Sequence, residues 1–231
     1  MDFFDSLINE VISTIENSKK SAYRFNESER WADLGYNQVV LQRDTAFELN
    51  GTGFSLVTSK AVADEIIVVG NDISSIASSG ALSRIAIVQV DDTDDAQQSY
   101  DLIKKIEFVK YHCFPDGYMM RSASSSFKES VRVSKKSLLN GLTFEKIGNL
   151  LISEYKKIPS VKGVKMIFVT DERINYSEFE KIAEKNREIT ETLNKVMNNL
   201  VFDCTTCNLK PICDEVEGMR ELHFKSAKGE M

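Results

Sequence analysis

The most constraining stretch of this sequence is a nearly uninterrupted apolar run at residues 84–90, Arg-Ile-Ala-Ile-Val-Gln-Val. Half-buried strands alternate apolar and polar residues, whereas a continuous apolar run is typical of a strand in the interior of a sheet. We therefore predict an interior strand here. Helical patterns before and after the run then favour a sheet packed with helices.

Periodicity in the rest of the chain predicts the other elements. Apolar residues spaced three and four apart predict helices over residues 3–18, 94–110, 143–155 and 175–199, and Gly141 is expected to end a short helix over 135–140. Residues 111–128 are polar and are predicted to be irregular. Asn50-Gly51 is predicted to be a turn between strands. Shorter apolar runs predict strands at 39–41, 46–49, 54–57, 65–69, 131–133 and 162–169.

This element order predicts an α+β (or α/β) fold, with a mixed β-sheet packed with helices. No internal repeat is visible in the sequence. We divide the chain into an N-terminal helical arm at residues 1–36, an α/β core at 37–200 and a cysteine-rich metal-binding tail at 201–231. Trp31, the single tryptophan, is expected to anchor the arm onto the core.

Composition excludes several classes of protein. The net charge of −6 argues against nucleic-acid binding, which requires a basic field. No apolar run reaches the roughly 18 residues that a membrane helix needs. The acidic N-terminus lacks the positive region of a secretory signal. We therefore expect a cytoplasmic protein, in which thiols stay reduced and metal binding outranks disulfides.

Three of the four cysteines form a C-x2-C-x5-C pattern at Cys204, Cys207 and Cys213. Closely spaced thiolates suit zinc or an iron–sulfur cluster. His223 is a candidate fourth ligand, although a surface histidine is an equal alternative. Cys113 is expected to be a core residue. Carboxylates near the cysteines are further candidate ligands, namely Asp203, Asp214 and Glu215.

A basic zone lies in the middle of this acidic chain. Arg121, Lys128 and Arg132 are candidates for binding an anion or a phosphate-bearing cofactor, and Lys135 and Lys136 follow them. The alternative is an ordinary solvated loop surface.

From about Ala46 to Cys213 the chain resembles the middle domain of acetyl-CoA synthase, the β subunit of the CO dehydrogenase/acetyl-CoA synthase complex. Individual segments are short, and their common order along the chain carries the resemblance. The long helix and the Cys204-x2-Cys207 pair then follow in the family's order. The resembling segments are Val69-Gly70-Asn71-Asp72-Ile73, Ile85–Val90, Val131–Lys135, Gly141–Tyr155 and Val164–Glu172.

The resemblance implies that Cys204, Cys207 and Cys213 hold a [4Fe–4S] cluster. At the offset of the family's fourth cysteine this chain has His223. Cys207 and Cys213 enclose five residues where the family has eight. The family's later Cys-Gly-Cys segment, which holds nickel, has no counterpart here. Ser130 replaces an aromatic residue implicated in CoA contact.

The resemblance suggests an iron–sulfur protein that acts in electron transfer or as an accessory subunit of an anaerobic one-carbon system, and that is inactive alone. A protein partner or a homo-oligomer is expected, and a CoA-type anionic ligand is possible. One alternative is a structural zinc module for protein interaction. Another is a CoA- or nucleotide-binding domain with a structural metal. No catalytic nucleophile or triad is visible in the sequence, and catalytic residues remain unassigned.

Overall fold

One mixed sheet forms the centre of the molecule. In the computed structural model, residues 3–92, 95–123 and 127–197 are described. Within them seven strands pair in the order β1-β3-β7-β4-β2-β6-β5, which confirms the predicted fold class. The strands are β1 Lys20–Arg24, β2 Thr45–Thr58, β3 Glu65–Val69, β4 Gly80–Val90, β5 Tyr118–Ser122, β6 Lys128–Ser134 and β7 Val161–Val169.

The interior strand predicted from residues 84–90 is confirmed as part of β4. It pairs with β7 in antiparallel and with β2 in parallel orientation. Residues 82–88 are all buried. Because both faces of β4 are covered, its sequence shows no alternation of apolar and polar residues.

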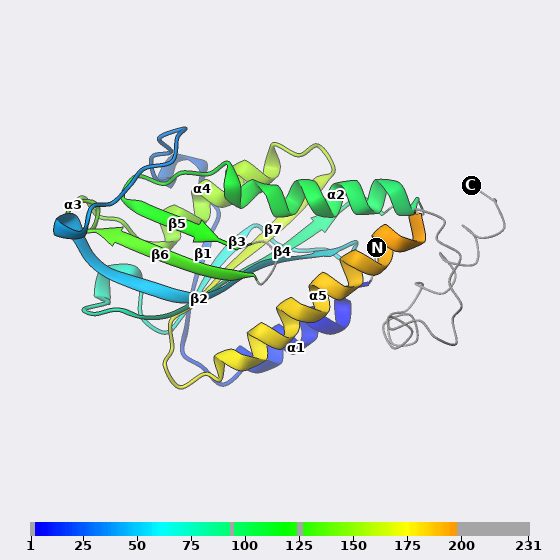
Figure 1. Ribbon diagram of the computed structural model, residues 1–231, viewed down its shortest axis with the longest axis horizontal. Coiled ribbons are helices and arrows are strands. Elements are labelled where there is room, and N and C mark those ends of the chain that lie inside the picture. Colours follow the sequence, from blue (N-terminus) through cyan, green and yellow to red (C-terminus); the bar gives the residue numbers. More distant parts are fainter. Residues whose placement is uncertain (1–2, 93–94, 124–126, 198–231) are drawn as a thin grey trace.

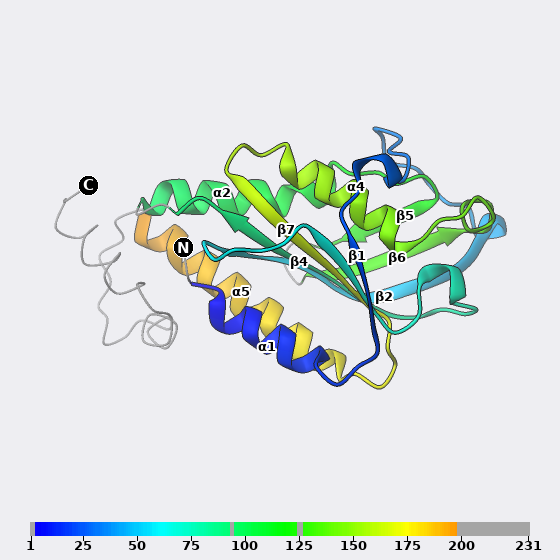
Figure 2. The same cartoon turned by 180° about the vertical axis from the view of Figure 1, so that it is seen from behind.

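Helices cover both faces of this sheet (Figures 1 and 2). α2 and α4 lie on one face, and α1 and α5 lie side by side on the other. Thr143 Oγ1 accepts a hydrogen bond from the Lys146 N–H and caps α4, at the residue where the sequence predicted this helix to begin. The helices are α1 Asp5–Ile15, α2 Ala96–Phe108, α3 Lys135–Leu139, α4 Phe144–Lys156 and α5 Tyr176–Met197.

The N-terminal segment is built into the same core as the rest of the described chain. The α1 stripe of Leu7, Val11 and Ile15 is buried. Strand β1, which the sequence did not predict, pairs with β3 at one edge of the sheet. Trp31 donates its indole N–H to the Asp116 carbonyl (2.8 Å), so it anchors this segment as expected.

Three local predictions were wrong. Asn50-Gly51 is not a turn, because β2 continues through it to Thr58. Gly51 is required by close strand packing, since a Cβ there would lie 2.0 Å from the Leu82 carbonyl oxygen. Residues 39–41 form no strand. Residues 111–128 are not irregular throughout, because they contain β5, which pairs with β6 as a hairpin.

Candidate functional site

The predicted basic residues lie on the β5–β6 hairpin. Ser130 on β6 pairs with both Arg121 on β5 and Asn50 on β2, so these three side chains share one face of the sheet. This is the face that α5 covers farther along, because Glu180 of α5 also borders the site. The resulting basin measures about 630 Å³ and is lined by Asn50, Gly51, Arg121, Ser122, Ala123, Lys128, Glu129, Ser130 and Glu180.

Two of the three predicted cations meet in this basin. Arg121 and Lys128 both line it, and both are exposed. Within the described part of the chain neither makes an ion pair. Glu180 adds an opposing negative charge at the border. The basin therefore offers two available cations to an anionic group, with the exposed carboxylate of Glu180 to tune its affinity.

The third predicted cation is engaged elsewhere. Arg132 donates to Glu48 from Nε (2.7 Å) and lies 2.6 Å from it through Nη2. Arg132 Nη1 also donates to the Val40 carbonyl (3.2 Å). It does not line the basin. The structure thus separates Arg132 from Arg121 and Lys128 and gives it a local binding partner.

The predicted metal ligands Cys204, Cys207, Cys213 and His223 lie outside the described residues. Among residues 3–92, 95–123 and 127–197, no group of three or more His, Cys, Asp or Glu side chains is placed to hold a metal ion. Cys113 is buried, as the sequence predicted. None of the described helices is long and apolar enough to cross a membrane.

A buried ion pair lies on the opposite face of the sheet, and sequence reasoning missed it. Arg84 on β4 reaches across β2 to Glu129 on β6. Arg84 Nε donates to Glu129 Oε1 (2.8 Å) and Nη2 donates to Oε2 (2.7 Å). The pair crosses at Gly53, where a Cβ would lie 2.0 Å from Glu129 Oε2. An arginine within an apolar strand and a glycine inside another were the available sequence signals.

Each member of this pair keeps the other ionised. Burial disfavours the charged guanidinium, but the bonded Glu129 carboxylate raises the pKa of Arg84 above its ordinary value. Burial likewise opposes ionisation of Glu129, yet the charge and hydrogen bonds of Arg84 hold the pKa of Glu129 below its ordinary value. Ser122 donates a further hydrogen bond to Glu129 (2.9 Å). Both groups are therefore charged at neutral pH.

A second buried cation lies next to this pair. Lys110, in the 3₁₀ turn η4 (Val109–Tyr111), donates to the Gly53 carbonyl (3.3 Å). Its side chain is almost completely buried. Burial, and then the nearby positive charge of Arg84, lower the pKa of Lys110 to about 8. Lys110 therefore remains mostly protonated at neutral pH, although its environment disfavours the charge.

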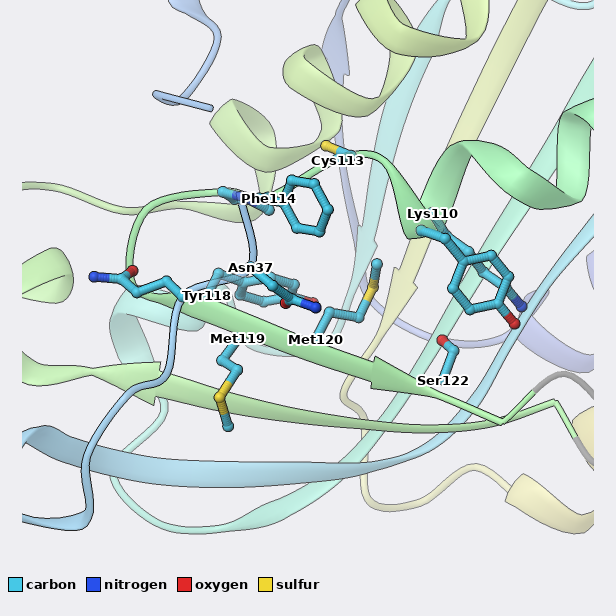
Figure 3. A pocket seen from close by; sticks show the side chains of 11 residues that line it. Asn37, Lys110, Cys113, Phe114, Tyr118, Met119, Met120 and Ser122 are labelled. Carbon is cyan, nitrogen blue, oxygen red and sulfur yellow. The ribbon is translucent and has the colours of Figure 1, made fainter. Parts of the chain in front are cut away.

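A small cavity of about 60 Å³ lies between η4, β5 and the chain near Asn37 (Figure 3). In Figure 3 Met120 and Ser122 rise from β5 on the side where Lys110, Cys113 and Phe114 lie, and Met119 points to the other side. The cavity is lined by Asn37, Gln38, Lys110, Tyr111, Cys113, Phe114, Pro115, Tyr118, Met119, Met120 and Ser122. Ser122 also lines the basin.

Comparison with known proteins assigns the family. No curated protein matched this chain. A family model described as "CO dehydrogenase/acetyl-CoA synthase complex beta subunit" matches residues 30–174, which is more than half of the chain. The match includes the basin's hairpin and the buried ion pair, and it stops before α5 and the cysteine segment. The chain therefore belongs to the family of the CO dehydrogenase/acetyl-CoA synthase complex β subunit.

Proposed function

We propose that this protein is an accessory component of a CO dehydrogenase/acetyl-CoA synthase-type system, in which its α/β core binds a CoA-type anionic ligand. The family match over residues 30–174 is the observation that carries this proposal. The family is a subunit of a complex, so a protein partner fits the same proposal. We propose no reaction for this chain alone.

The basin is the proposed ligand site. CoA carries a pyrophosphate and a further phosphate, and such groups bind well to arginine and lysine side chains. Arg121 and Lys128 supply two such cations in a basin of about 630 Å³. That volume is within the usual range for small-molecule sites. Ser130, Asn50 and Ser122 add neutral hydrogen-bonding groups.

Calorimetric titration of the full chain with CoA tests this site. We expect saturable binding that weakens by about tenfold in Arg121→Ala and in Lys128→Ala, because each loses a charge-assisted contact. Glu180→Gln should bind more tightly, since it removes the opposing charge. Lys136→Ala, a cation outside the basin, is the control. Absence of binding by the unmodified chain, or equal losses in Lys136→Ala, would contradict the proposal.

The cysteine segment is the proposed site of an iron–sulfur cluster. Three thiolates at Cys204, Cys207 and Cys213, with His223 as a fourth ligand, fit the chemistry of a [4Fe–4S] cluster. The same donor set fits tetrahedral zinc, which is the second candidate. The cluster, when bound, would supply one-electron transfer, and this would support the proposed role in electron transfer.

Elemental analysis of protein purified without oxygen separates the two candidates. Iron with acid-labile sulfide, together with a cluster signal in electron paramagnetic resonance after reduction, would support the cluster. Zinc without sulfide would support the structural module instead. Cys204→Ser and Cys207→Ser should each lose the metal, whereas Cys113→Ser, which changes the buried core cysteine, should keep it. Metal-free protein after anaerobic reconstitution would contradict both.

A further inference from the structure

The edge of the sheet that β1 forms is open to solvent. β1 is first in the strand order, and its one partner among the described strands is β3. Figure 2 shows β1 in the foreground, and four of its five residues are exposed, namely Lys20, Ser21, Ala22 and Arg24. An open strand edge presents unpaired backbone groups on which another chain can form a strand. The family match begins at residue 30, after β1, and assigns this edge no role.

Hydrogen bonds to β3 fix which backbone groups of β1 point outward. The Gly70 N–H donates to the Lys19 carbonyl, and the Phe25 N–H donates to the Asp64 carbonyl, both at 3.1 Å. In an antiparallel pair, residues that bond to the neighbouring strand alternate with residues that do not. Residues 19, 21, 23 and 25 therefore bond to β3. The remaining residues of the strand direct their N–H and C=O groups to the open edge, namely Lys20, Ala22 and Arg24.

Charge at this edge indicates the kind of partner that fits it. Lys20 and Arg24 lie on one face of β1, which contains no Asp or Glu. Among the described residues neither makes an ion pair, and the Lys20 amine donates only to the Glu16 carbonyl (3.1 Å). Glu65, opposite Arg24 on β3, is already paired with Lys165 (2.8 Å). The edge is therefore cationic, although the whole chain has a net charge of −6.

The same charges disfavour a second copy of this chain as the partner. Antiparallel pairing of β1 with itself, centred on Ala22, would place Lys20 opposite Arg24 of the other copy. The strand at the other edge of the sheet, β5, contains Arg121 and no carboxylate. Like charges directly opposite each other on paired strands are destabilising. The strand that fits this edge carries carboxylates instead.

We propose that β1 is a docking strand for an acidic, extended segment of a partner protein, which adds a further strand to the sheet. Backbone hydrogen bonds at Lys20, Ala22 and Arg24 supply affinity, and carboxylates on the partner strand meet the two cations. The basin lies near the other end of the strand order, on β5, β6 and β2, so docking at β1 is independent of CoA binding.

Nuclear magnetic resonance of the ¹⁵N-labelled full chain, titrated with acetyl-Thr-Glu-Thr-Val-Thr-Glu-Thr-amide, tests the proposal. The two glutamates of this peptide have the spacing of Lys20 and Arg24. We expect saturable shifts centred on the amides of Lys20, Ala22 and Arg24, which become protected from hydrogen exchange. A peptide with lysine in place of both glutamates should not bind. Absence of saturable shifts in β1, or equal binding of the two peptides, would overturn the proposal.

Ala22→Pro separates strand pairing from simple charge attraction. Because the Ala22 N–H points outward, proline at this position removes no hydrogen bond to β3 and leaves both cations in place. It should weaken peptide binding by about tenfold or more, since one intermolecular hydrogen bond is lost and the ring obstructs the incoming strand. Ser21→Ala, whose side chain lies on the other face, is the control and should bind normally. Unchanged binding by Ala22→Pro would mean that charge alone attracts the peptide, contrary to the proposal.

N-methylated peptides give the same test on unmodified protein, and remain informative if Ala22→Pro does not fold. Only alternate N–H groups of the peptide face β1. Methylation of either the central valine N–H or the adjacent threonine N–H should therefore abolish binding, but not both. The valine is the sensitive position in an antiparallel pair, and the threonine is the sensitive position in a parallel pair. Equal effects of the two methyl groups would contradict strand pairing.

Reversal of both cations should exchange the preferred peptide. Lys20→Glu combined with Arg24→Glu should bind the lysine peptide and should lose affinity for the glutamate peptide by at least about tenfold. Lys135→Glu combined with Lys136→Glu, on α3, changes the net charge equally and is the control. An unaltered preference after reversal at β1 would overturn the proposal. A dimer of the unmodified protein that Ala22→Pro dissociates, measured by sedimentation, would assign the edge to a second copy instead.

Discussion

The ion pair of Arg84 and Glu129 shows how burial determines what an ion pair contributes to stability. Their bidentate contact at 2.7 and 2.8 Å lies in the buried sheet layer, with side-chain exposures of 0% and 2%. Taking both charges out of water is costly, and the geometry of the pair offsets that cost. The loss of folding stability should therefore be largest when only one partner of the pair is removed.

Glu129→Gln should destabilise the protein by about 3–5 kcal/mol, because it leaves Arg84 charged and buried without its counterion. Replacing both partners, as in Arg84→Met with Glu129→Leu, should cost less. Urea unfolding followed by circular dichroism measures both values. A single Gln substitution that costs less than the double replacement would contradict this reasoning.

Lys110 should make stability depend on pH in an identifiable window. Its pKa is about 8 in the folded protein and 10.5 as the ordinary value. Between these values the unfolded chain binds more protons, so this group's contribution to folding stability rises with pH. Lys110→Met should remove a penalty of about 3 kcal/mol that is full below about pH 8 and shrinks toward pH 10.5.

Urea unfolding of the unmodified protein and Lys110→Met across this window checks the expectation. The difference in the free energy of unfolding between the two proteins, taken at each pH, reports on Lys110 alone, because the tyrosines, which also titrate at high pH, are present in both. A pH-independent difference would show that Lys110 is not the titrating group.

At the scale of elements, strand β2 depends on two glycines, Gly51, which the sequence predicted to lie in a turn, and Gly53. Gly53 permits Arg84 and Glu129 to meet across the strand. Gly53→Ala should therefore cost about 1–3 kcal/mol or more through overpacking. Gly80→Ala at the start of β4 is the matched control, since nothing lies within 4 Å of the Cβ it adds. Equal unfolding midpoints for the two variants would contradict this explanation.

Elements with a strong local signal were predictable from the sequence. The apolar run of β4 and the apolar stripes of α1, α4 and α5 could each be recognised from the spacing of apolar residues along the chain. β1 and β5 were not predictable in this way, because each is a short strand at an edge of the sheet; β1 pairs with β3, which is distant in the chain, and β5 pairs with β6. The sequence of β1 is mostly polar and resembles a loop, and the short apolar run of β5 lies within a stretch that is otherwise polar.

The candidate site likewise contains residues that the sequence predicted and contacts that it did not. Arg121 and Lys128 were identified from charge alone, and the β5–β6 pairing brings them into one basin. Arg132 lies on the same face of β6 as Lys128, but its guanidinium donates a hydrogen bond to Glu48 of β2. The Arg84–Glu129 pair and the Lys110 cavity depend on contacts between five separate elements, β2, β4, β5, β6 and η4. No spacing rule along the chain encodes such contacts.

For the molecule as a whole, a single buried cluster includes residues from α1 through α5. The described chain should therefore unfold as one cooperative unit. Trp31 is the only tryptophan, so its fluorescence reports on the N-terminal segment. Its unfolding midpoint in urea should coincide with that from far-ultraviolet circular dichroism. An earlier fluorescence transition would show that residues 1–36 form a separate arm.

The crossing of β2 by a salt bridge also has an evolutionary consequence. A side chain at position 53 and an arginine–carboxylate pair at positions 84 and 129 cannot occupy the same space. Descendants of a common ancestor should thus keep or lose these three positions together. Any related protein with a larger residue in place of Gly53 is expected to carry uncharged residues at both of the other positions.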